Sequence, residues 1–226
     1  MTIDPARVRW IASFPKSGNT WVRIFLANLI VGKPDRALTL AEITAMPFYS
    51  DNMENPEVSC ELLGKAHHPY SLERHGTKPA IYIVRDPVDV AVSAARYFGV
   101  TPQRMAKEVA RDWSRHVQSW WGHVGLVLKY ENMPSNFHAL AQYLTIPSDF
   151  GSVSAATYHS GLANLQRDEQ ENGFEEANAD VKDPFFRRGS PGEGREVLTP
   201  DEVQMIIDGA GEWYEHFGYG EMDART

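Results

Sequence analysis

The sequence predicts an α/β protein, in which a parallel β-sheet is flanked by helices on both faces. Two observations indicate this class. Short apolar runs typical of buried strands alternate along the chain with longer segments of helical periodicity. The first of these runs leads through a short polar stretch into an amphipathic segment, which is the strand–loop–helix arrangement of P-loop-like folds. We expect residues 1–226 to form a single domain, because this length is enough for one sizeable core.

Each element rests on a local pattern. Strands are predicted where apolar runs end at polar or turn-forming residues, over 9–14 (RWIASF), 80–84 (AIYIV) and 124–130 (VGLVLKY). Helices are predicted where apolar residues recur at helical spacing, over 20–31, 87–98, 102–121, 135–144 and 199–217. Gly32 ends the first helix, Pro87 starts the second and Thr199 caps the last. The irregular segments 33–60 and 171–198 are expected to cover a site at the carboxyl ends of the strands.

Composition excludes several classes of function. The net charge of −8 argues against general nucleic-acid binding. Cys60 is the only cysteine, so the chain forms no intrachain disulfide and no cysteine metal cluster. The longest apolar run, 21–32, is interrupted by Arg23 and Asn28 and is too short to span a bilayer. Because the first residues also lack a secretory apolar region, we expect a cytoplasmic protein without nucleic-acid or membrane partners.

The stretch SFPKSGNTW at 13–21 has the composition of an anion-binding loop. A loop between a strand and a helix lies at the positive end of that helix, where backbone N–H groups are available to an anion. Gly18 allows close approach of the backbone, Lys16 adds a positive charge, and Ser17 and Thr20 add hydroxyl donors. An ordinary turn with solvated polar residues is the alternative. The stretch lacks the second glycine of a nucleotide-binding P-loop, and no apolar strand ends in an obvious magnesium-binding aspartate.

Two further clusters combine arginine with features that suit phosphate binding. In YIVRDPVDVAVS, Arg85 ends a buried strand and Ser93 lies two turns into the next helix. The alternative for Arg85 is a salt bridge to Asp86 or Asp89. In FFRRGSPGEGR, guanidinium groups lie among glycine and proline residues, which suggests either a second anion clamp or a solvated basic loop. The arginines of that loop are Arg187, Arg188 and Arg195.

Together and in this order, the three motifs resemble those of the sulfotransferase family, which transfers a sulfuryl group from 3′-phosphoadenosine 5′-phosphosulfate (PAPS). FPKSGNTW resembles its 5′-phosphosulfate loop, VRDPVDVAVS its 3′-phosphate motif, and FFRRGSPGEG the late loop that closes over the 3′-phosphate. The resemblance runs from about residue 10 to about residue 200, and WIASFPKSGNTWVR is similar to bacterial members. It implies PAPS as co-substrate, the bisphosphate PAP as product, and transfer without a metal.

The resemblance also implies a role for each matched residue. Lys16 would neutralise charge on the departing oxygen, and Lys65 would help to bind the sulfuryl group. The 5′-phosphate would be held by Ser17, Gly18, Asn19 and Thr20, with Asn19 in place of the commoner threonine. The 3′-phosphate would be held by Arg85, Ser93, Arg187, Arg188 and the backbone of Gly189, with Arg188 in place of lysine.

The resemblance is less specific around the adenine. Trp21 would lie against the base, although an aromatic residue in an amphipathic helix is as readily a core residue. Tyr130, in LKYENM, resembles an adenine contact, although a strand-end tyrosine is often simply buried. Ser160, in YHSGLANL, is a further candidate.

The resemblance places the catalytic base in LLGKAHHPY at 62–70. The family has a K-x-H sequence at the end of a strand, and Lys65 and His67 match it. An attacking hydroxyl must lose its proton, and histidine, with an ordinary pKa near neutrality, suits that task. His68 is the immediate rival. Successive side chains of a strand point to opposite faces, so only one of the two can serve, and either could instead be a structural or surface histidine.

Two other functions stay open at this point. A P-loop kinase that uses ATP and magnesium shares the architecture but needs a Walker lysine and a metal ligand that the sequence does not show. A non-catalytic nucleotide-binding protein would have no need of Lys65 with His67. We expect the acceptor to be a small molecule or natural product with a hydroxyl or amine group. Candidates for an apolar acceptor wall are Met46, Phe48, Tyr49 and Met53. The oligomeric state cannot be read from the sequence.

Overall fold

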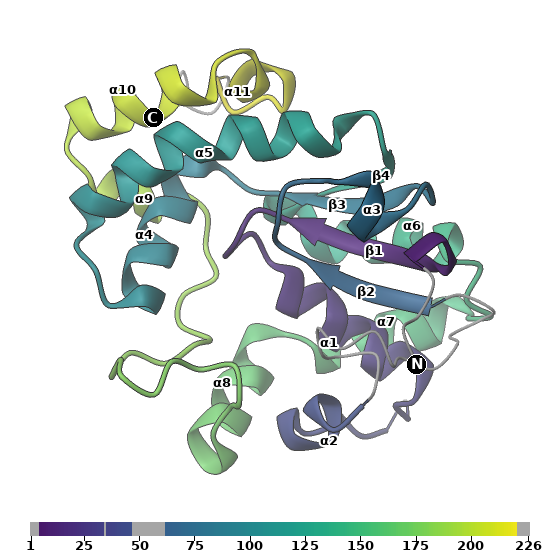
Figure 1. Ribbon diagram of the computed structural model, residues 1–226. Coiled ribbons are helices and arrows are strands. Elements are labelled where there is room, and N and C mark those ends of the chain that lie inside the picture. Colours follow the sequence, from purple (N-terminus) through teal and green to yellow (C-terminus); the bar gives the residue numbers. More distant parts are fainter. Residues whose placement is uncertain (1–4, 34, 47–61, 221–226) are drawn as a thin grey trace.

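A four-stranded parallel sheet forms the centre of the molecule (Figure 1). The computed structural model describes residues 5–33, 35–46 and 62–220. The strands are β1 (Val8–Ser13), β2 (Leu62–Ala66), β3 (Ala80–Val84) and β4 (Val124–Lys129), in the order β2-β1-β3-β4. The predicted parallel sheet with helices on both faces is confirmed.

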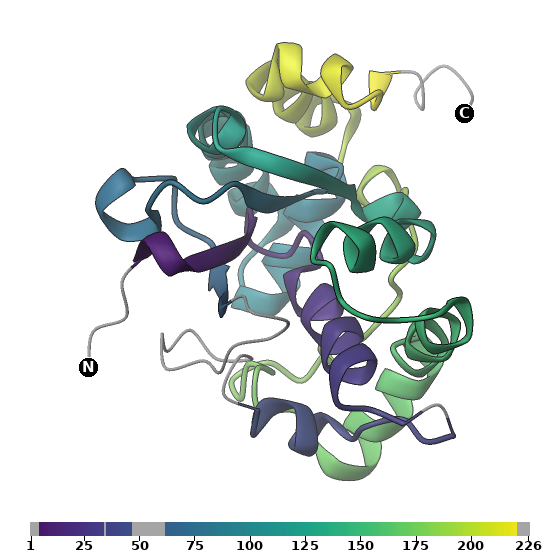
Figure 2. The ribbon, with the colours of Figure 1, turned by 90° about the vertical axis from the view of Figure 1, so that its right-hand side faces the viewer.

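The two faces of the sheet are covered by different helices, because side chains alternate along each strand. On one face, Val8, Trp10 and Ala12 of β1 join the apolar core made with three long helices. These helices are α4 (Pro87–Phe98), α5 (Pro102–Trp121) and α10 (Pro200–Ala210). On the other face, Ile11 and Ile81 pack with α1 (Asn19–Ile30), α6 (Met133–Tyr143) and α7 (Phe150–His159). Figure 2 shows these two helix layers on opposite sides of the sheet.

The strand order places a site between β1 and β3. The chain leaves β1 through α1 toward β2 on one side, and it leaves β3 through α4 and α5 toward β4 on the other. The loops after the two neighbouring strands therefore diverge and leave a crevice at their carboxyl ends, which is where open α/β sheets bind ligands. The segment 173–192 runs past this edge, between α8 (Leu162–Asn172) and α9 (Glu193–Val197) (Figure 1).

Several elements differ from the sequence-based expectation. The helix predicted at 199–217 is two helices, α10 and α11 (Glu212–His216), because Gly211 interrupts it with a positive φ of 57°. The predicted Thr199 cap is confirmed. Short helices occur within the segments expected to be irregular, namely α2 (Leu40–Thr44) and α9. The elements that were not predicted also include η1 (Pro5–Arg7), α3 (Leu72–His75), η2 (Tyr130–Asn132), α7 and α8.

Part of the expected acceptor wall, Phe48, Tyr49 and Met53, lies outside the described residues. Within the described ranges, no helix combines the length and the apolar character that crossing a membrane requires.

The contact between α5 and α10 depends on a glycine. A Cβ atom on Gly209 would lie 2.1 Å from the backbone oxygen of Ala110, so any side chain there forces the helices apart. We expect Gly209→Ala to lower the free energy of unfolding by roughly 1–3 kcal/mol, as overpacking usually does. Urea denaturation followed by circular dichroism measures this. Gly122→Ala is the matched control, because φ is −69° there and a new Cβ meets nothing within 4 Å. Equal stability of the two variants would contradict the close contact.

Candidate active site

The loop after β1 has the backbone of an anion site. Lys16 and Gly18 both have positive φ, 65° and 103°, and α1 begins at Asn19 with no side-chain cap on its first N–H groups. Gly18 is required, because a Cβ there would lie 2.7 Å from the ring of Tyr130. Ser17 is fully buried, and its hydroxyl has no hydrogen-bond partner among the described residues. Uncapped N–H groups and a buried hydroxyl without a partner fit a bound phosphate or sulfate group.

The ammonium group of Lys16 lies in the cavity between two aromatic rings. Its Nζ is 3.9 Å from the ring centroid of Tyr97 and 3.8 Å from that of Phe185. Burial lowers the pKa of Lys16 to about 7, Glu176 opposes this shift, and the positive charges of Arg85 and Lys65 add to it. Such a cation gains most from an anion that neutralises it.

Arg85 and two aromatic residues form one wall of the cavity. The guanidinium of Arg85 lies 4.1 Å from the ring centroid of Tyr130, and it donates to the carbonyl oxygen of Lys16 at 3.1 Å. Its Nε has no hydrogen-bond partner among the described residues. Trp21 meets Tyr130 edge-on at 5.6 Å. Ser160 does not line the cavity: its hydroxyl donates to Thr157, and only its carbonyl reaches the indole of Trp21.

The aspartates after Arg85 do not neutralise it. Asp86 forms an ion pair with Arg195 at 2.7 Å. Asp89 accepts from the backbone N–H groups of Gly192 and Gly194, at 2.8 Å and 2.7 Å. The salt bridge proposed as the alternative for Arg85 is therefore not formed. Both aspartates instead bind the end of the late loop, FFRRGSPGEGR, to the start of α4.

The late loop brings two of its arginines to the same cavity. Arg187 pairs with Glu193, which also pairs with Arg96 of α4. Arg188 is about half exposed and pairs with Glu196 at 2.6 Å. The carbonyl of Gly189 accepts from the hydroxyl of Tyr130 at 3.3 Å. Arg96 was not singled out in the sequence, although it lies one turn after Ser93 on the same helix face.

His67 lies directly after β2, and its ring is held by the end of β1. Its Nδ1 is 3.0 Å from the carbonyl oxygen of Ser13 and 3.2 Å from the Ser13 hydroxyl. A carbonyl only accepts, so Nδ1 carries the hydrogen in a neutral ring and Nε2 keeps its lone pair. His67 lines the cavity, whereas His68 has an exposed side chain and contributes its carbonyl to the indole N–H of Trp120.

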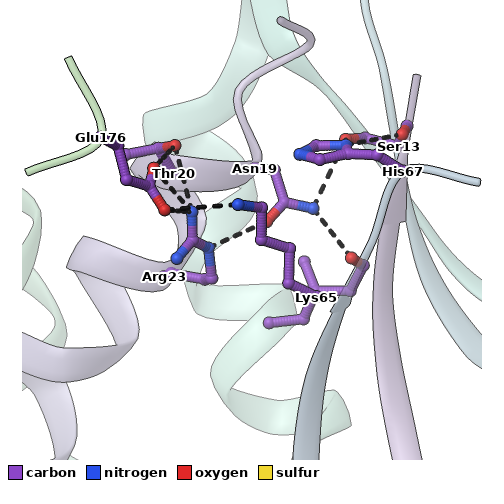
Figure 3. A network of polar contacts seen from close by, with 8 residues as sticks. Ser13, Asn19, Thr20, Arg23, Lys65, His67 and Glu176 are labelled. Carbon is purple, nitrogen blue, oxygen red and sulfur yellow. Dashed lines mark hydrogen bonds and ion pairs between the residues drawn. The ribbon is translucent and has the colours of Figure 1, made fainter. Parts of the chain in front are cut away.

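A polar network connects this histidine to α1 and to segment 173–192 (Figure 3). The Asn19 amide donates to the carbonyl of Ile11 at 2.8 Å and to Ser13 at 3.4 Å, and it accepts from the buried Arg23 at 3.0 Å. Arg23 in turn pairs with Glu176. The side chain of Asn19 is thus turned toward β1 and away from the cavity, which leaves its backbone N–H as the group that an anion can use.

Almost every residue predicted for the site lines one cavity of about 580 Å³. From the loop and β2 these are Lys16, Gly18, Asn19, Thr20, Trp21, Lys65 and His67. From β3, α4 and the later segments they are Arg85, Ser93, Tyr130, Arg187, Arg188 and Gly189. Ser17 lies in the wall of the loop. Sequence reasoning missed Tyr97, Arg96, Phe185, Glu176 and Glu193, which also line the cavity.

Comparison with known proteins identifies the family. A model described as "Sulfotransferase domain" matches residues 7–218, so the chain belongs to this family. Rat Sulfotransferase 1A1 is 24% identical over 230 residues, which cover 84% of this chain and 78% of the rat protein. Cytosolic sulfotransferase 1 of Arabidopsis thaliana is 26% identical over 255 residues, covering 88% of this chain and 76% of the plant protein.

Solved structures show the same fold. The mouse sulfotransferase SULT7A1, complexed with PAP, matches with a TM-score of 0.66 at 20% identity, over 98% of this chain and 89% of the mouse chain. Retinol dehydratase, in complex with androsterone and PAP, matches with a TM-score of 0.68 at 17% identity, over 95% of this chain and 82% of its own. The enzyme class predicted from the sequence, a PAPS-dependent sulfotransferase, is confirmed.

Proposed function

We propose that this enzyme transfers a sulfuryl group from PAPS to a hydroxyl or amine group of a small-molecule acceptor, with His67 as the general base. The observation that carries the proposal is the meeting of Lys16, Lys65, His67 and Arg85 in one cavity at the uncapped start of α1. Four solved or curated relatives named above are sulfotransferases or proteins bound to PAP, which supports the same donor.

The donor is held by charge at both of its phosphorylated ends. Ser17, Gly18, Thr20 and the backbone N–H of Asn19 bind the 5′-phosphate at the start of α1. Ser93 and four arginines hold the 3′-phosphate. The arginines are Arg85, Arg187, Arg188 and Arg96, the last of which is included because it lies one turn after Ser93. The ring of Trp21 and the ring of Tyr130 provide apolar surface for the adenine. When bound, PAPS supplies the sulfuryl group and retains the electron pair of the broken sulfur–oxygen bond on its phosphate.

Three side chains around the sulfuryl end of the donor have separate roles in the transfer. The Nε2 of His67 takes the proton of the acceptor hydroxyl, because Ser13 holds the hydrogen of the ring on Nδ1. Lys16 offsets the negative charge that grows on the departing phosphate, and Lys65 binds the oxygens of the group in transfer. No cluster of three potential metal-ligating side chains occurs in the described part of the chain, and transfer without a metal stays a prediction.

A screen with radiolabelled PAPS against phenols, alcohols and amines tests the proposed reaction. Label should pass to at least one acceptor, and binding measurements should favour PAPS over ATP, with or without magnesium. Preference for ATP with magnesium would instead support a kinase, and nucleotide binding without transfer to any acceptor would support a binding protein. The acceptor and the cytoplasmic location stay predictions from the sequence.

The arginine clamp predicts a strong dependence on the 3′-phosphate. PAP should bind far more tightly than 5′-AMP, since losing a desolvated charge pair at a binding site costs roughly 2–5 kcal/mol. Isothermal titration calorimetry measures both affinities. The difference should shrink in Arg85→Met, because Arg85 is buried and its Nε has no partner among the described residues. Equal affinities of the unsubstituted enzyme for the two nucleotides would contradict the clamp.

A further inference from the structure

Glu176 places a carboxylate among the cations of the proposed donor site. It lies on segment 173–192, and its carboxylate contacts side chains of both α1 and β2 (Figure 3). Its Oε2 accepts from the hydroxyl of Thr20 at 2.8 Å, and its Oε1 lies 3.3 Å from the ammonium of Lys65. Arg23 donates to both carboxylate oxygens, at 2.8 Å and 3.0 Å.

Two of these three partners belong to the proposed phosphosulfate site. Thr20 is assigned to the 5′-phosphate and Lys65 to the sulfuryl group. A threonine hydroxyl has a single hydrogen, so Thr20 cannot donate to Glu176 and to a phosphate oxygen at the same time. The carboxylate and the 5′ end of the donor therefore need the same hydrogen.

The charge of Glu176 strengthens this competition. Burial alone raises the pKa of this carboxyl, but Arg23 and Lys65 outweigh burial and hold the pKa below its usual value. Glu176 is consequently ionised at neutral pH. A phosphate bound at Thr20 would lie next to the full negative charge of Glu176. Placing two like charges side by side in a partly buried site is costly.

We propose that Glu176 is an internal stand-in for the phosphosulfate group, which holds Thr20 and Lys65 until the donor nucleotide displaces it. The inference rests on the proposed function, because that function assigns those two residues to the donor. Arg23 is buried to 1% exposure and requires an anion, so Glu176 keeps Arg23 and releases only the other two partners. Glu176 thereby lowers the affinity for nucleotides with a charged 5′ end and leaves the 3′ end unaffected.

Calorimetry with two nucleotides and two variants tests this. Glu176→Gln should bind PAP at least about 10-fold more tightly than the unsubstituted enzyme. A tenfold change in affinity is only a modest part of the repulsion between a carboxylate and a phosphate that share one hydrogen-bond donor. Adenosine 3′-phosphate, which has no 5′-phosphate, should bind both proteins equally. Glu175→Gln is the matched control, because Glu175 lines the same cavity and carries the same charge one residue away, but its side chain is exposed. It should change the PAP affinity less than about threefold, because water and salt screen exposed charges.

The outcomes separate the inference from the function on which it rests. If Glu176→Gln binds PAP equally or more weakly, Glu176 only anchors segment 173–192 and the inference is wrong. If the unsubstituted enzyme does not prefer PAP over 5′-AMP, the proposed function itself fails. Should Glu176→Gln not fold, the double variant Arg23→Met/Glu176→Gln removes both charges of the buried pair, a replacement that proteins often tolerate. The same tightening of PAP is expected there, and its absence overturns the inference.

Discussion

Replacing His67 by asparagine should abolish most sulfuryl transfer while the enzyme still binds PAP. The Nδ1 of His67 faces the carbonyl of Ser13, so Nε2 is the atom left to take a proton in the cavity. Asparagine can keep a donor toward that carbonyl but offers no base. Loss of a general base typically lowers a rate by about 10²–10⁴-fold. Two measurements separate the effect on rate from the effect on binding: turnover with the acceptor found by screening, and PAP affinity by calorimetry.

His68 provides the matched control for this experiment. Its side chain is exposed, and its carbonyl, which bonds Trp120, is unaffected by a side-chain substitution. His68→Ala should therefore retain activity within a small factor. In the unsubstituted enzyme the rate should fall at acidic pH, because a protonated imidazole cannot accept a proton, and the fall should be steepest for acceptors of high pKa. A dead His68→Ala variant beside an active His67→Asn variant would reverse the assignment of the base.

Sequence patterns predicted the parts of this site that depend on strand ends and helix starts. The loop around Lys16 follows a buried strand and precedes an amphipathic helix, so its place at the carboxyl edge of the sheet follows from connectivity alone. Arg85 ends the next strand of the sheet and reaches the same crevice for the same reason. The pairing of β1 with both β2 and β3 then brings His67 beside them.

The residues that sequence reasoning missed depend on tertiary contacts. Nothing in the sequence of the pair Glu175 and Glu176 indicates that Glu176, and not Glu175, bonds Thr20 and Lys65. Arg23 did carry a signal: it interrupts the apolar stripe of α1, and a buried guanidinium there requires an anion from elsewhere in the fold. The helix α8 was missed for a different reason. It is strongly polar and Leu165 is its one buried residue, so its sequence shows little of the apolar periodicity that predicts a helix.

Asn19 shows how a correct motif can still mislead about a side chain. Its position in the loop suggests a polar contact to phosphate, and the loop is indeed at the start of α1. Its amide instead bonds Ile11, Ser13 and Arg23, and it is nearly fully buried. Buried polar groups need partners, and the nearest ones here are the carbonyl of the preceding strand and the guanidinium one turn later.

Lys16 should matter more for turnover than for binding of the donor. A cation at the departing oxygen gains most as negative charge develops, so its loss belongs mainly to the transition state. We expect Lys16→Met to lower turnover at saturating PAPS by about 10²–10³-fold, the usual cost of one lost oxyanion donor. Affinity for PAP should fall by a much smaller factor. Near-normal turnover of Lys16→Met would make Lys16 only a phosphate contact.

The pH dependence of PAP binding gives an independent test of Lys16. Burial between the rings of Tyr97 and Phe185 lowers its pKa to about 7, so its cation is present below that pH and is lost above it. PAP affinity should therefore weaken from pH 7 to pH 9, by no more than the factor that Lys16→Met costs, because deprotonation and substitution remove the same positive charge. Lys16→Arg keeps its charge throughout this range, because a guanidinium stays protonated. Its PAP affinity should be flat with pH, and a slope equal to that of the unsubstituted enzyme would show that another group titrates.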